Sequence, residues 1–238
     1  MLHPALTQIR IVLVNTSHPG NIGATARAMH TMGLSSLYLV NPQHFPDPDA
    51  TARAAGGDGV LTQAQVVSSL EEALQGCGRI WATSALSRHL PWPIQTPKQA
   101  APEMVAAASQ QPVAVVFGCE RNGLTNEELQ ACHYHIQIPT QPDYGTLNLA
   151  AAVQIICYEI FSASHNPTAQ DPPVLATFEE VNGFYGQLEQ VIEQVGFLDR
   201  KHSGRLLQWL KRLLAKTQLE PKEVTILRGI LTAISRRL

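Results

Sequence analysis

Two hydrophobic patterns alternate along the first 161 residues. Short runs of β-branched and aliphatic side chains are typical of strands, and Val113–Phe117 is apolar at every position, as in a parallel strand that is covered on both faces. Helical stretches separate these runs. The pattern predicts strands at Ile9–Val14, Leu37–Val40, Arg79–Thr83, Val113–Phe117 and His135–Ile138, and helices near 21–33, 66–75, 97–109, 125–131 and 146–161. This alternation indicates an α/β fold with a mostly parallel sheet flanked by helices.

Two of the predicted helices begin with a capping signal. Ser68 followed by Glu71, and Thr125 followed by Glu128, each fit the capping box, in which side chains satisfy the free backbone N–H groups at a helix start. The predicted helix over 146–161 differs because it is apolar on almost every face. We therefore expect that helix to be buried, against the sheet or against another chain.

The pattern changes after Phe161. Residues 162–173 contain three prolines and little that a core would bury, which predicts a linker. Helices are predicted at roughly 177–195, 203–216 and 221–236, and the last has apolar residues at helical spacing, namely Val224, Leu227, Ile230, Leu231 and Ile234. The expected organisation is a domain over 1–161, a linker over 162–175 and a small helical extension over 176–238.

Charge is distributed unevenly between these parts. The 238 residues suffice for one large domain, or for a medium domain with a smaller one, and the net charge is −2. Residues 198–238 carry ten Lys/Arg against three Asp/Glu, a net charge of +7, which leaves −9 for the first 197 residues. Such asymmetry favours an extension that binds a polyanion, although two helices with solvated basic faces would have the same charge.

The sequence lacks the signals of several classes of protein. The best membrane candidate, Leu147–Ile156, is half the roughly 20 residues of a spanning helix, and the first residues have no basic or apolar signal region, so we expect neither a span nor a signal peptide. The four cysteines form no C-x-x-C pair, which favours reduced thiols in the cytoplasm. No metal site is expected, because Cys132, His133 and His135 have no second ligand pair at usable spacing. A G-x-S-x-G nucleophile elbow is also absent.

The first segment with candidate chemistry is Asn15–Ala28, which follows a strand and opens a helix. Gly20 and Gly23 are predicted to let the backbone turn tightly, and free N–H groups at the helix start favour an anion. The segment is neither a dinucleotide fingerprint nor a P-loop. Arg27 follows among small side chains, where a guanidinium reaches far and suits a phosphate, although a surface salt bridge is the ordinary role of such a residue.

Two more segments follow strands that are predicted to be buried. In Phe117–Leu124, glycines frame a loop that contains Glu120, which suits either a ligand contact or the fixing of a neighbouring loop; an ordinary strand-to-helix turn would look similar. In Ile136–Val153, a Pro/Gly-rich loop leads from a strand into the apolar helix. Turned backbone groups beside a helix start can cradle a polar ligand.

Three motifs occur here in one order: N-x-G-A-x-x-R at 21–27, F-G-x-E-x-x-G-L at 117–124, and I-P followed by Y-x-T-L-N-L-A within 138–150. Together they resemble the SPOUT superfamily of RNA methyltransferases, whose fold contains a deep trefoil knot. The longer stretches LVNTSHPGNIGATARAM, SALSRHLPWP and FGCERNGLTNEEL resemble its bacterial tRNA 2′-O-ribose methyltransferases that act at nucleotide 32 of the anticodon loop, on cytidine or uridine.

The resemblance implies a SAM-dependent enzyme with no metal, a tRNA substrate, and a homodimer in which Arg27 of each protomer reaches the partner's cofactor site. It implies catalytic or orienting roles for Arg27, Thr146, Asn21 and Asn148, with Arg27 anchoring a phosphate rather than acting as a base. The implied cofactor contacts are Thr83, Ser84, Ala85, Gly118, Glu120, Ile138, Gly145, Thr146 and Leu147.

The chain departs from the family pattern at two positions. Thr146 stands where serine is usual, which keeps a hydroxyl but adds a methyl group, and Cys119 stands where close relatives often have a basic residue. Three alternatives therefore remain open: an rRNA or other RNA 2′-O-methyltransferase of the same superfamily, a non-catalytic RNA-binding module with a degenerate pocket, and a small-substrate enzyme on a doubly wound sheet. The last leaves the basic extension unexplained.

Overall fold

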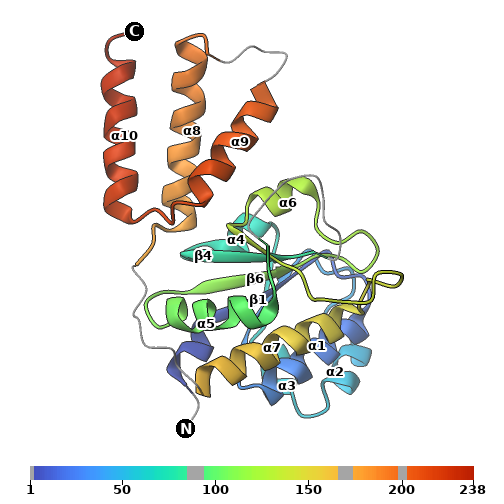
Figure 1. The fold of residues 1–238 in the computed structure, drawn as a ribbon. Helices are drawn as coiled ribbons and strands as arrows, with labels where there is room; N and C mark the ends of the chain where they lie inside the picture. Colours follow the sequence, from blue (N-terminus) through green and yellow to red (C-terminus); the bar gives the residue numbers. More distant parts are fainter. Residues whose placement is uncertain (1–2, 85–93, 166–173, 198–202) are drawn as a thin grey trace. The chain divides into compact units, whose positions relative to one another are not determined.

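The computed structural model describes residues 3–84, 94–165, 174–197 and 203–238. The chain forms two compact units, Met1–Pro172 and Pro173–Leu238, and each is described by itself. Figure 1 shows the succession of their elements along the chain.

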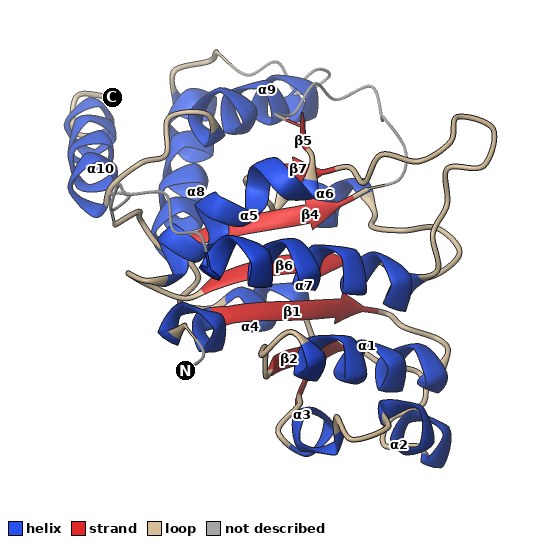
Figure 2. Ribbon diagram, turned by 60° about the horizontal axis from the view of Figure 1, so that its bottom comes forward, coloured by secondary structure: helices blue, strands red, loops and turns tan. Residues whose placement is uncertain are grey.

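The first unit is built on a parallel sheet. Its described residues form seven strands in the order β3-β2-β1-β6-β4-β7-β5, and every paired neighbour is parallel (Figure 2). In that order the strands are β3 (Gln65–Val67), β2 (Ser36–Val40), β1 (Ile9–Val14), β6 (Val113–Phe117), β4 (Arg79–Thr83), β7 (Tyr134–Ile136) and β5 (Ile94–Gln95). Val113 of β6 pairs with Ile9 on one side and Arg79 on the other, so β6 is central and fully buried, as predicted. The carboxyl ends of β6, β4 and β7 therefore lie side by side at one edge of the sheet.

Helices cover both faces of this sheet. On one face, α7 (Leu149–His165) packs between α1 (Pro19–Thr31) and α5 (Pro97–Ala108), as Figure 2 shows, and a short 3₁₀ helix, η1 (Pro4–Gln8), packs beside α5. Two short helices, α2 (Pro48–Ala54) and α3 (Asp58–Thr62), pack on α1. In Figure 1, α4 (Leu70–Leu74) and α6 (Asn126–Gln130) lie across the sheet from α7. The expected α/β fold with a flanked parallel sheet is confirmed; the knot stays a prediction.

Four short elements, β3, β5, α2 and α3, were not predicted. Strands β3 and β5 have three and two residues, and α2 and α3 have seven and five, which is too short for a clear period. The helix predicted over 66–75 was wrong at its start, because residues 65–67 pair with β2 and the helix begins only at Leu70. Its cap is Ser69, which accepts from the Glu72 N–H, one residue after the predicted pair. The capping box of Thr125 and Glu128 is confirmed.

Helix α7 differs from its prediction at both ends. It begins at Leu149 rather than 146, and it continues to His165, so residues 162–165 are helical and not part of a linker. The Phe161 ring packs on His165 with 4.2 Å between ring centroids, and the hydroxyl of Ser164 donates to the Phe161 carbonyl, which supports the extra turn. The helix buries its Leu149, Val153, Ile156 and Ile160 side on the core, as expected, but leaves Ala151 and Tyr158 exposed.

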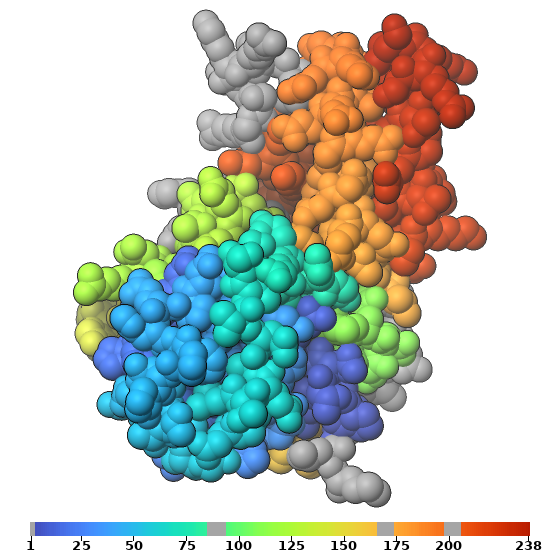
Figure 3. Space-filling view, turned by 180° about the vertical axis from the view of Figure 1, so that it is seen from behind, coloured from blue at the N-terminus to red at the C-terminus, as the bar shows by residue number. Residues whose placement is uncertain are grey.

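The second unit consists of α8 (Phe178–Gln194), α9 (Ser203–Ala215) and α10 (Pro221–Ser235), close to the predicted ranges. Helices α8 and α10 pack together around a small core, and their orange and red surfaces lie side by side in Figure 3. Of the predicted apolar positions of α10, Val224 and Leu231 are buried, whereas Ile230 and Ile234 are exposed. The buried side chains of this core are Ala176, Val181, Phe184, Val191, Val224 and Leu231.

Candidate active site

The described part of the first unit contains a pocket of about 170 Å³ at the carboxyl ends of β4, β6 and β7. Its apolar lining includes Phe117, Ile136 and Leu149, and loop residues supply the polar groups. The described residues that were predicted to contact a cofactor all line this one pocket: Thr83, Ser84, Gly118, Glu120, Ile138, Gly145, Thr146 and Leu147. Ala85 lies outside the described residues. Three segments that are far apart in sequence thus form a single concave site.

The ends of the strands fix the floor of the pocket. Ser84 donates its backbone N–H to the carbonyl of Ile136, which extends the β4–β7 pairing by one residue. The hydroxyl of Thr83 donates to the carbonyl of Val116 at 3.1 Å and joins β4 to β6. Strand β7 ends at Ile136, two residues earlier than predicted, so Ile138 has left the sheet and lines the pocket.

The loop after β6 folds back on itself. The backbone N–H of Gly123 donates to the carbonyl of Cys119 at 3.0 Å, and the Cys119 thiol donates back to the Gly123 carbonyl at 3.6 Å. A Cβ atom on Gly118 would lie 2.1 Å from the carbonyl carbon of Gly123, so only glycine fits there. Gly123 has φ +66°, in the left-handed region that glycine adopts freely.

Glu120 joins this loop to the first motif. One carboxylate oxygen accepts from the Ser17 N–H at 3.1 Å and the Ser17 hydroxyl at 3.0 Å. The other accepts from the His18 N–H at 3.2 Å and the side-chain amide of Asn21 at 2.8 Å. The start of the first-motif helix does attract an anion, as its sequence predicts, but that anion is a side chain of the same protein.

Asn21 carries the connection on to the third motif. Because its Nδ2 donates to Glu120, its Oδ1 is free to accept, and it does so from Nδ2 of Asn148 at 3.0 Å. The Oδ1 of Asn148 then accepts from the N–H groups of Ala150 and Ala151 and satisfies the first turn of α7. This chain of hydrogen bonds, hereafter the Glu120–Asn21–Asn148 network, links the three motifs.

The network also sets the charge state of Glu120. Partial burial by itself would raise the pKa of this carboxyl. Hydrogen bonds from the Asn21 side chain and from the Ser17 and His18 N–H groups favour the charged form, and the resulting pKa lies below the usual 4.5. Glu120 therefore holds its partners as a carboxylate at neutral pH.

Gly20 and Gly23, of the segment Asn15–Ala28, act differently from prediction. Both lie inside α1, not in a turn before it. A Cβ on Gly23 would lie 2.0 Å from the carbonyl oxygen of Ala50 in α2, and one on Gly20 would lie 2.7 Å from the Arg53 and Asp49 side chains. These glycines therefore allow close packing of α1 against α2, a long-range contact that local sequence does not reveal.

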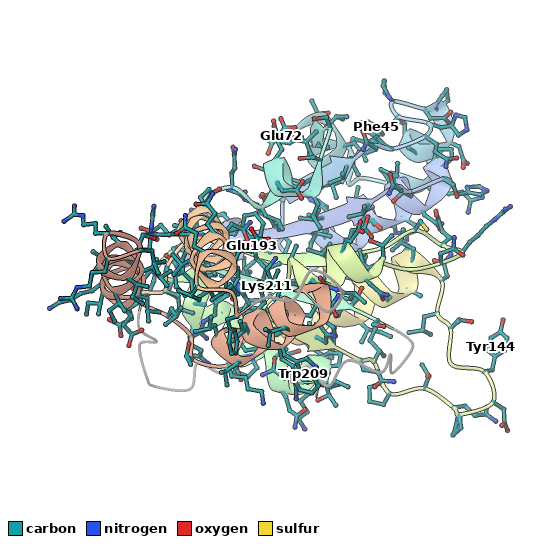
Figure 4. The ribbon with its side chains drawn as sticks, turned by 90° about the horizontal axis from the view of Figure 1, so that it is seen from above. Phe45, Glu72, Tyr144, Glu193, Trp209 and Lys211 are labelled. Carbon is teal, nitrogen blue, oxygen red and sulfur yellow. The ribbon has the colours of Figure 1, made fainter. Side chains whose placement is uncertain are left out.

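The third-motif loop stands beside the pocket mouth. The Thr140 hydroxyl donates to the Gly145 carbonyl at 3.2 Å, and the Tyr144 N–H donates to the carbonyl of Gln141. Figure 4 shows Tyr144 on an outlying stretch of this loop, and its side chain is 78% exposed. Thr146 and Leu147 line the pocket and are also exposed, so they sit where an incoming substrate would meet the site.

Three of the described residues that were predicted to act in the site do not line the pocket: Asn21 and Asn148, which bond to each other in the network, and Arg27. Arg27 is exposed on α1, and its guanidinium makes no hydrogen bond or ion pair within residues 3–84, 94–165, 174–197 and 203–238. Sequence reasoning, in turn, missed Arg121, Asn122 and Thr140, which do line the pocket. Arg121 and Asn122 lie in the second motif, and their position between its two glycines could have indicated that they line the pocket.

The Cys132–His135 segment is structural. Nδ1 of His133 accepts from the Ile80 N–H at 3.2 Å, and burial, together with nearby Arg79, lowers the pKa of His133 to about 4. Burial likewise lowers the pKa of His135 to about 4, so both rings are neutral at pH 7. In the described residues, no group of three or more His, Cys, Asp or Glu is arranged to bind a metal ion. No helix among them is both long and apolar enough to cross a bilayer.

Comparisons with known proteins agree with this architecture. Residues 8–158 match the SpoU rRNA Methylase family, and residues 179–238 match the C-terminal domain of the tRNA methyltransferase TrmJ. A relative from Sodalis glossinidius (strain morsitans), named tRNA (cytidine/uridine-2′-O-)-methyltransferase TrmJ, is 49% identical, with 98% of this chain and 92% of that protein aligned.

Solved structures extend the comparison. The crystal structure of TrmJ from Z. mobilis ZM4 has a TM-score of 0.83 and 33% identity, and the match covers 95% of this chain and 98% of that one. A complex of the SpoU methyltransferase AviRb from Streptomyces viridochromogenes with AdoMet, at 20% identity and a TM-score of 0.55, matches in fold over 67% of this chain and 58% of that one. The resemblance to the SPOUT superfamily is thus confirmed, and this chain belongs to the SpoU methylase family and, within it, to the TrmJ enzymes.

Proposed function

We propose that this protein transfers the methyl group of SAM to the ribose 2′-oxygen of nucleotide 32 in the anticodon loop of tRNA. The observation that carries the proposal is one pocket lined by the second and third motifs, with Asn21 of the first motif bonded to Glu120 and Asn148. The relatives of this chain are named tRNA (cytidine/uridine-2′-O-)-methyltransferases. Such a reaction needs a site that aligns a ribose oxygen with an activated methyl group. It does not need a metal or a covalent enzyme intermediate.

The pocket suits SAM in its shape and chemistry. Apolar side chains (Phe117, Ile136 and Leu149) offer a surface for the adenine ring, and turned loops offer main-chain donors and acceptors for the polar groups. Gly118 is required here because a side chain would collide with the folded-back loop that forms one wall. The cofactor supplies the sulfonium methyl group. Thr83, Ser84, Ile138, Gly145, Thr146 and Leu147 hold it in this proposal, as does Ala85, while Glu120 shapes the wall.

Arg27 acts in a partner's site under this proposal. Arg27 does not line its own pocket, the residue is exposed, and its guanidinium has no partner among the described residues. We propose a homodimer in which the exposed side of α7, with Ala151 and Tyr158, packs against a second copy. Arg27 would then bind the phosphate next to the target ribose and stabilise negative charge on the 2′-oxygen.

The polar residues of the motifs divide into two groups. Thr146 is exposed at the pocket mouth, so its hydroxyl is available to the ribose. The amide groups of Asn21 and Asn148 bond to each other, to Glu120 and to the start of α7. Asn21 and Asn148 are therefore positioning residues here: they hold the loops in place and do not contact the reacting atoms.

The domains would divide the work between them. Residues 1–165, to the end of α7, carry the reaction, residues 166–175 connect, and residues 176–238 bind tRNA through the basic C-terminal helices. The match of 179–238 to the TrmJ C-terminal domain supports this division and favours tRNA over rRNA. A tRNA substrate also supports a place in the cytoplasm.

Incubation with labelled SAM and unmodified tRNA, followed by nuclease mapping, tests the proposal. We expect one methyl group on ribose 32. Label found only on another RNA class would reassign the enzyme to an rRNA-type sibling. Absence of calorimetric heat or thermal shift with SAM would identify a non-catalytic RNA-binding module instead.

A further inference from the structure

The outer face of α9 combines an aromatic ring with positive charges. Trp209, Arg212 and Leu213 recur at helical spacing on one side of α9, and Lys216, the first residue after the helix, continues the same spacing. Trp209 is 48% exposed and Leu213 is 60% exposed, so an apolar surface lies beside the charges. We call these four residues the α9 outer face.

The opposite side of α9 accounts for the packing of this helix. Leu214 packs against the core of the second unit, and the Tyr185 hydroxyl donates to the Lys211 carbonyl at 3.2 Å. The Lys211 ammonium lies 5.6 Å from the centre of the Tyr185 ring. Figure 4 shows Lys211 and Trp209 on different sides of the helix. The exposed Trp209 is therefore not needed to hold α9 in its unit.

The indole of Trp209 is arranged as a stacking platform. The guanidinium carbon of Arg212 lies 4.8 Å from the centre of its ring, so one ring face has a cationic partner. Arg212 is half-buried, and its Nε is buried without a hydrogen bond in the described part of the chain, so stacking on the ring, rather than a salt bridge, positions this group. Stacking leaves the terminal N–H donors of a guanidinium free for an anion.

Charge identifies the kind of partner. Residues 200–219 contain six Lys/Arg and no Asp or Glu, whereas α8 carries the acidic residues Glu179, Glu180, Glu189 and Glu193. The positive charge of residues 200–219 therefore favours a polyanion as partner over a protein surface that carries both acidic and basic side chains. A planar aromatic beside cations suits an unpaired nucleotide, whose base stacks and whose phosphate binds the cation.

We infer that the α9 outer face binds an unpaired nucleotide of the RNA substrate, with the base stacked on Trp209 and the flanking phosphates bound by Arg212 and Lys216. This inference rests on the proposed tRNA methylation and adds to it the contact made by the extension. A paired base presents no free face to the indole, so the contact selects loop or terminal nucleotides.

Fluorescence of Trp209 measures this contact directly. Of the other tryptophans, Trp81 is fully buried in the first unit, and Trp92 is removed by Trp92→Phe. In full-length protein with that background, we expect unmodified tRNA and a hairpin with an unpaired loop to quench the fluorescence, and a loop-free duplex of equal length to quench it much less. Equal quenching by the duplex would overturn the stacking.

Affinity variants give a second readout. Stacking on a base is worth roughly 5- to 100-fold in Kd when the ring is truncated, so Trp209→Ala should weaken tRNA binding by about that factor and Trp209→Phe should restore most of it. Arg212→Gln should lower the salt dependence of log Kd by about one unit of slope. Phe197→Ala is the matched control, because Phe197 is an exposed ring of the same unit outside α9, and it should change little.

The outcomes separate this inference from the proposed reaction. If Trp209→Ala and Phe197→Ala bind tRNA with the same Kd, the inference is overturned, even if ribose 32 is methylated. Normal quenching by tRNA without any methylation overturns the reaction and supports the contact. Quenching by phosphatidylserine vesicles but not by RNA overturns the inference in favour of a membrane surface. Circular dichroism of each variant confirms that the helices are intact.

Discussion

The substitution Glu120→Gln tests the Glu120–Asn21–Asn148 network. Glu120 accepts four hydrogen bonds, at 2.8 to 3.2 Å. A glutamine keeps one acceptor oxygen but replaces the other with an NH₂ donor. If the amide oxygen keeps Asn21 and His18, the NH₂ group faces the Ser17 N–H, and that hydrogen bond is lost together with the negative charge.

The expected cost follows from these contacts. Hydrogen bonds to a charged group contribute about 1.5–3 kcal/mol each when buried. Because Glu120 is exposed to solvent, we discount this to a total of about 1–2 kcal/mol for the lost bond and the weakened ones. For a unit of this size, that loss lowers Tm by roughly 2–8 °C. Turnover should fall more than SAM affinity, because the first-motif loop and the start of α7 lose their common anchor.

Thermal unfolding at pH 7 and initial methylation rates measure both effects, and Glu127→Gln is the matched control. Glu127 is an exposed carboxylate in the neighbouring helix α6 with no side-chain role in the network. The two substitutions remove the same charge. Equal Tm and equal turnover for the two variants would refute the positioning role of Glu120.

The pH dependence of stability gives an independent check on the direction of the Glu120 pKa shift. The folded pKa of Glu120 lies below its usual 4.5, so its stabilising effect is complete above about pH 4.5 and is lost as the pH falls through the lowered folded value. The difference in stability between wild type and Glu120→Gln should therefore be constant near neutrality and shrink in acid. A difference that grows on acidification would contradict the assigned hydrogen bonds.

Three further predictions concern the pocket and the extension. Arg27→Ala should abolish turnover while calorimetry still detects SAM binding, because Arg27 lies outside its own pocket; near-normal turnover would remove it from the catalytic residues. Gly118→Ala should destabilise the protein by about 2–4 kcal/mol and weaken SAM binding, because its Cβ would lie 2.1 Å from the Gly123 carbonyl carbon; an unchanged Tm would mean that the loop after β6 relaxes freely. Deletion of residues 166–238, after the end of α7, should weaken tRNA binding and flatten its salt dependence, since fewer counterions are released; an unchanged slope in a salt titration would make the extension merely structural.

Strong local patterns were sufficient for most of the fold. The central strand Val113–Phe117 and the capping box of Thr125 appear as predicted, because each depends on neighbours in sequence. Strands β3 and β5 do not follow from local pattern, since two or three residues become a strand only when a partner strand supplies hydrogen bonds. The same reason explains the error at residues 65–67.

In the candidate site, too, some features follow from the sequence and others depend on contacts between distant segments. The family resemblance implied eight of the residues that line the pocket, and they come together because they follow strands whose ends meet at one sheet edge. Spacing did not reveal that Asn21 bonds to Glu120 and to Asn148, since these two contacts join positions 99 and 127 residues apart. The cap of α7 by Asn148 is a local contact and was within reach of sequence.

The sequence by itself determined the α/β class, the contrast between an acidic first part and a basic tail, and the three segments that carry chemistry. Tertiary structure decided what each polar group does. Parallel pairing brought the strand ends together, and packing turned Gly20 and Gly23 into helix contacts. It also engaged Glu120, Asn21 and Asn148 with one another and left Arg27 and Trp209 exposed. The physical reason is that periodicity and capping depend on neighbours along the chain, whereas the partner of a side chain depends on which distant segment folds against it.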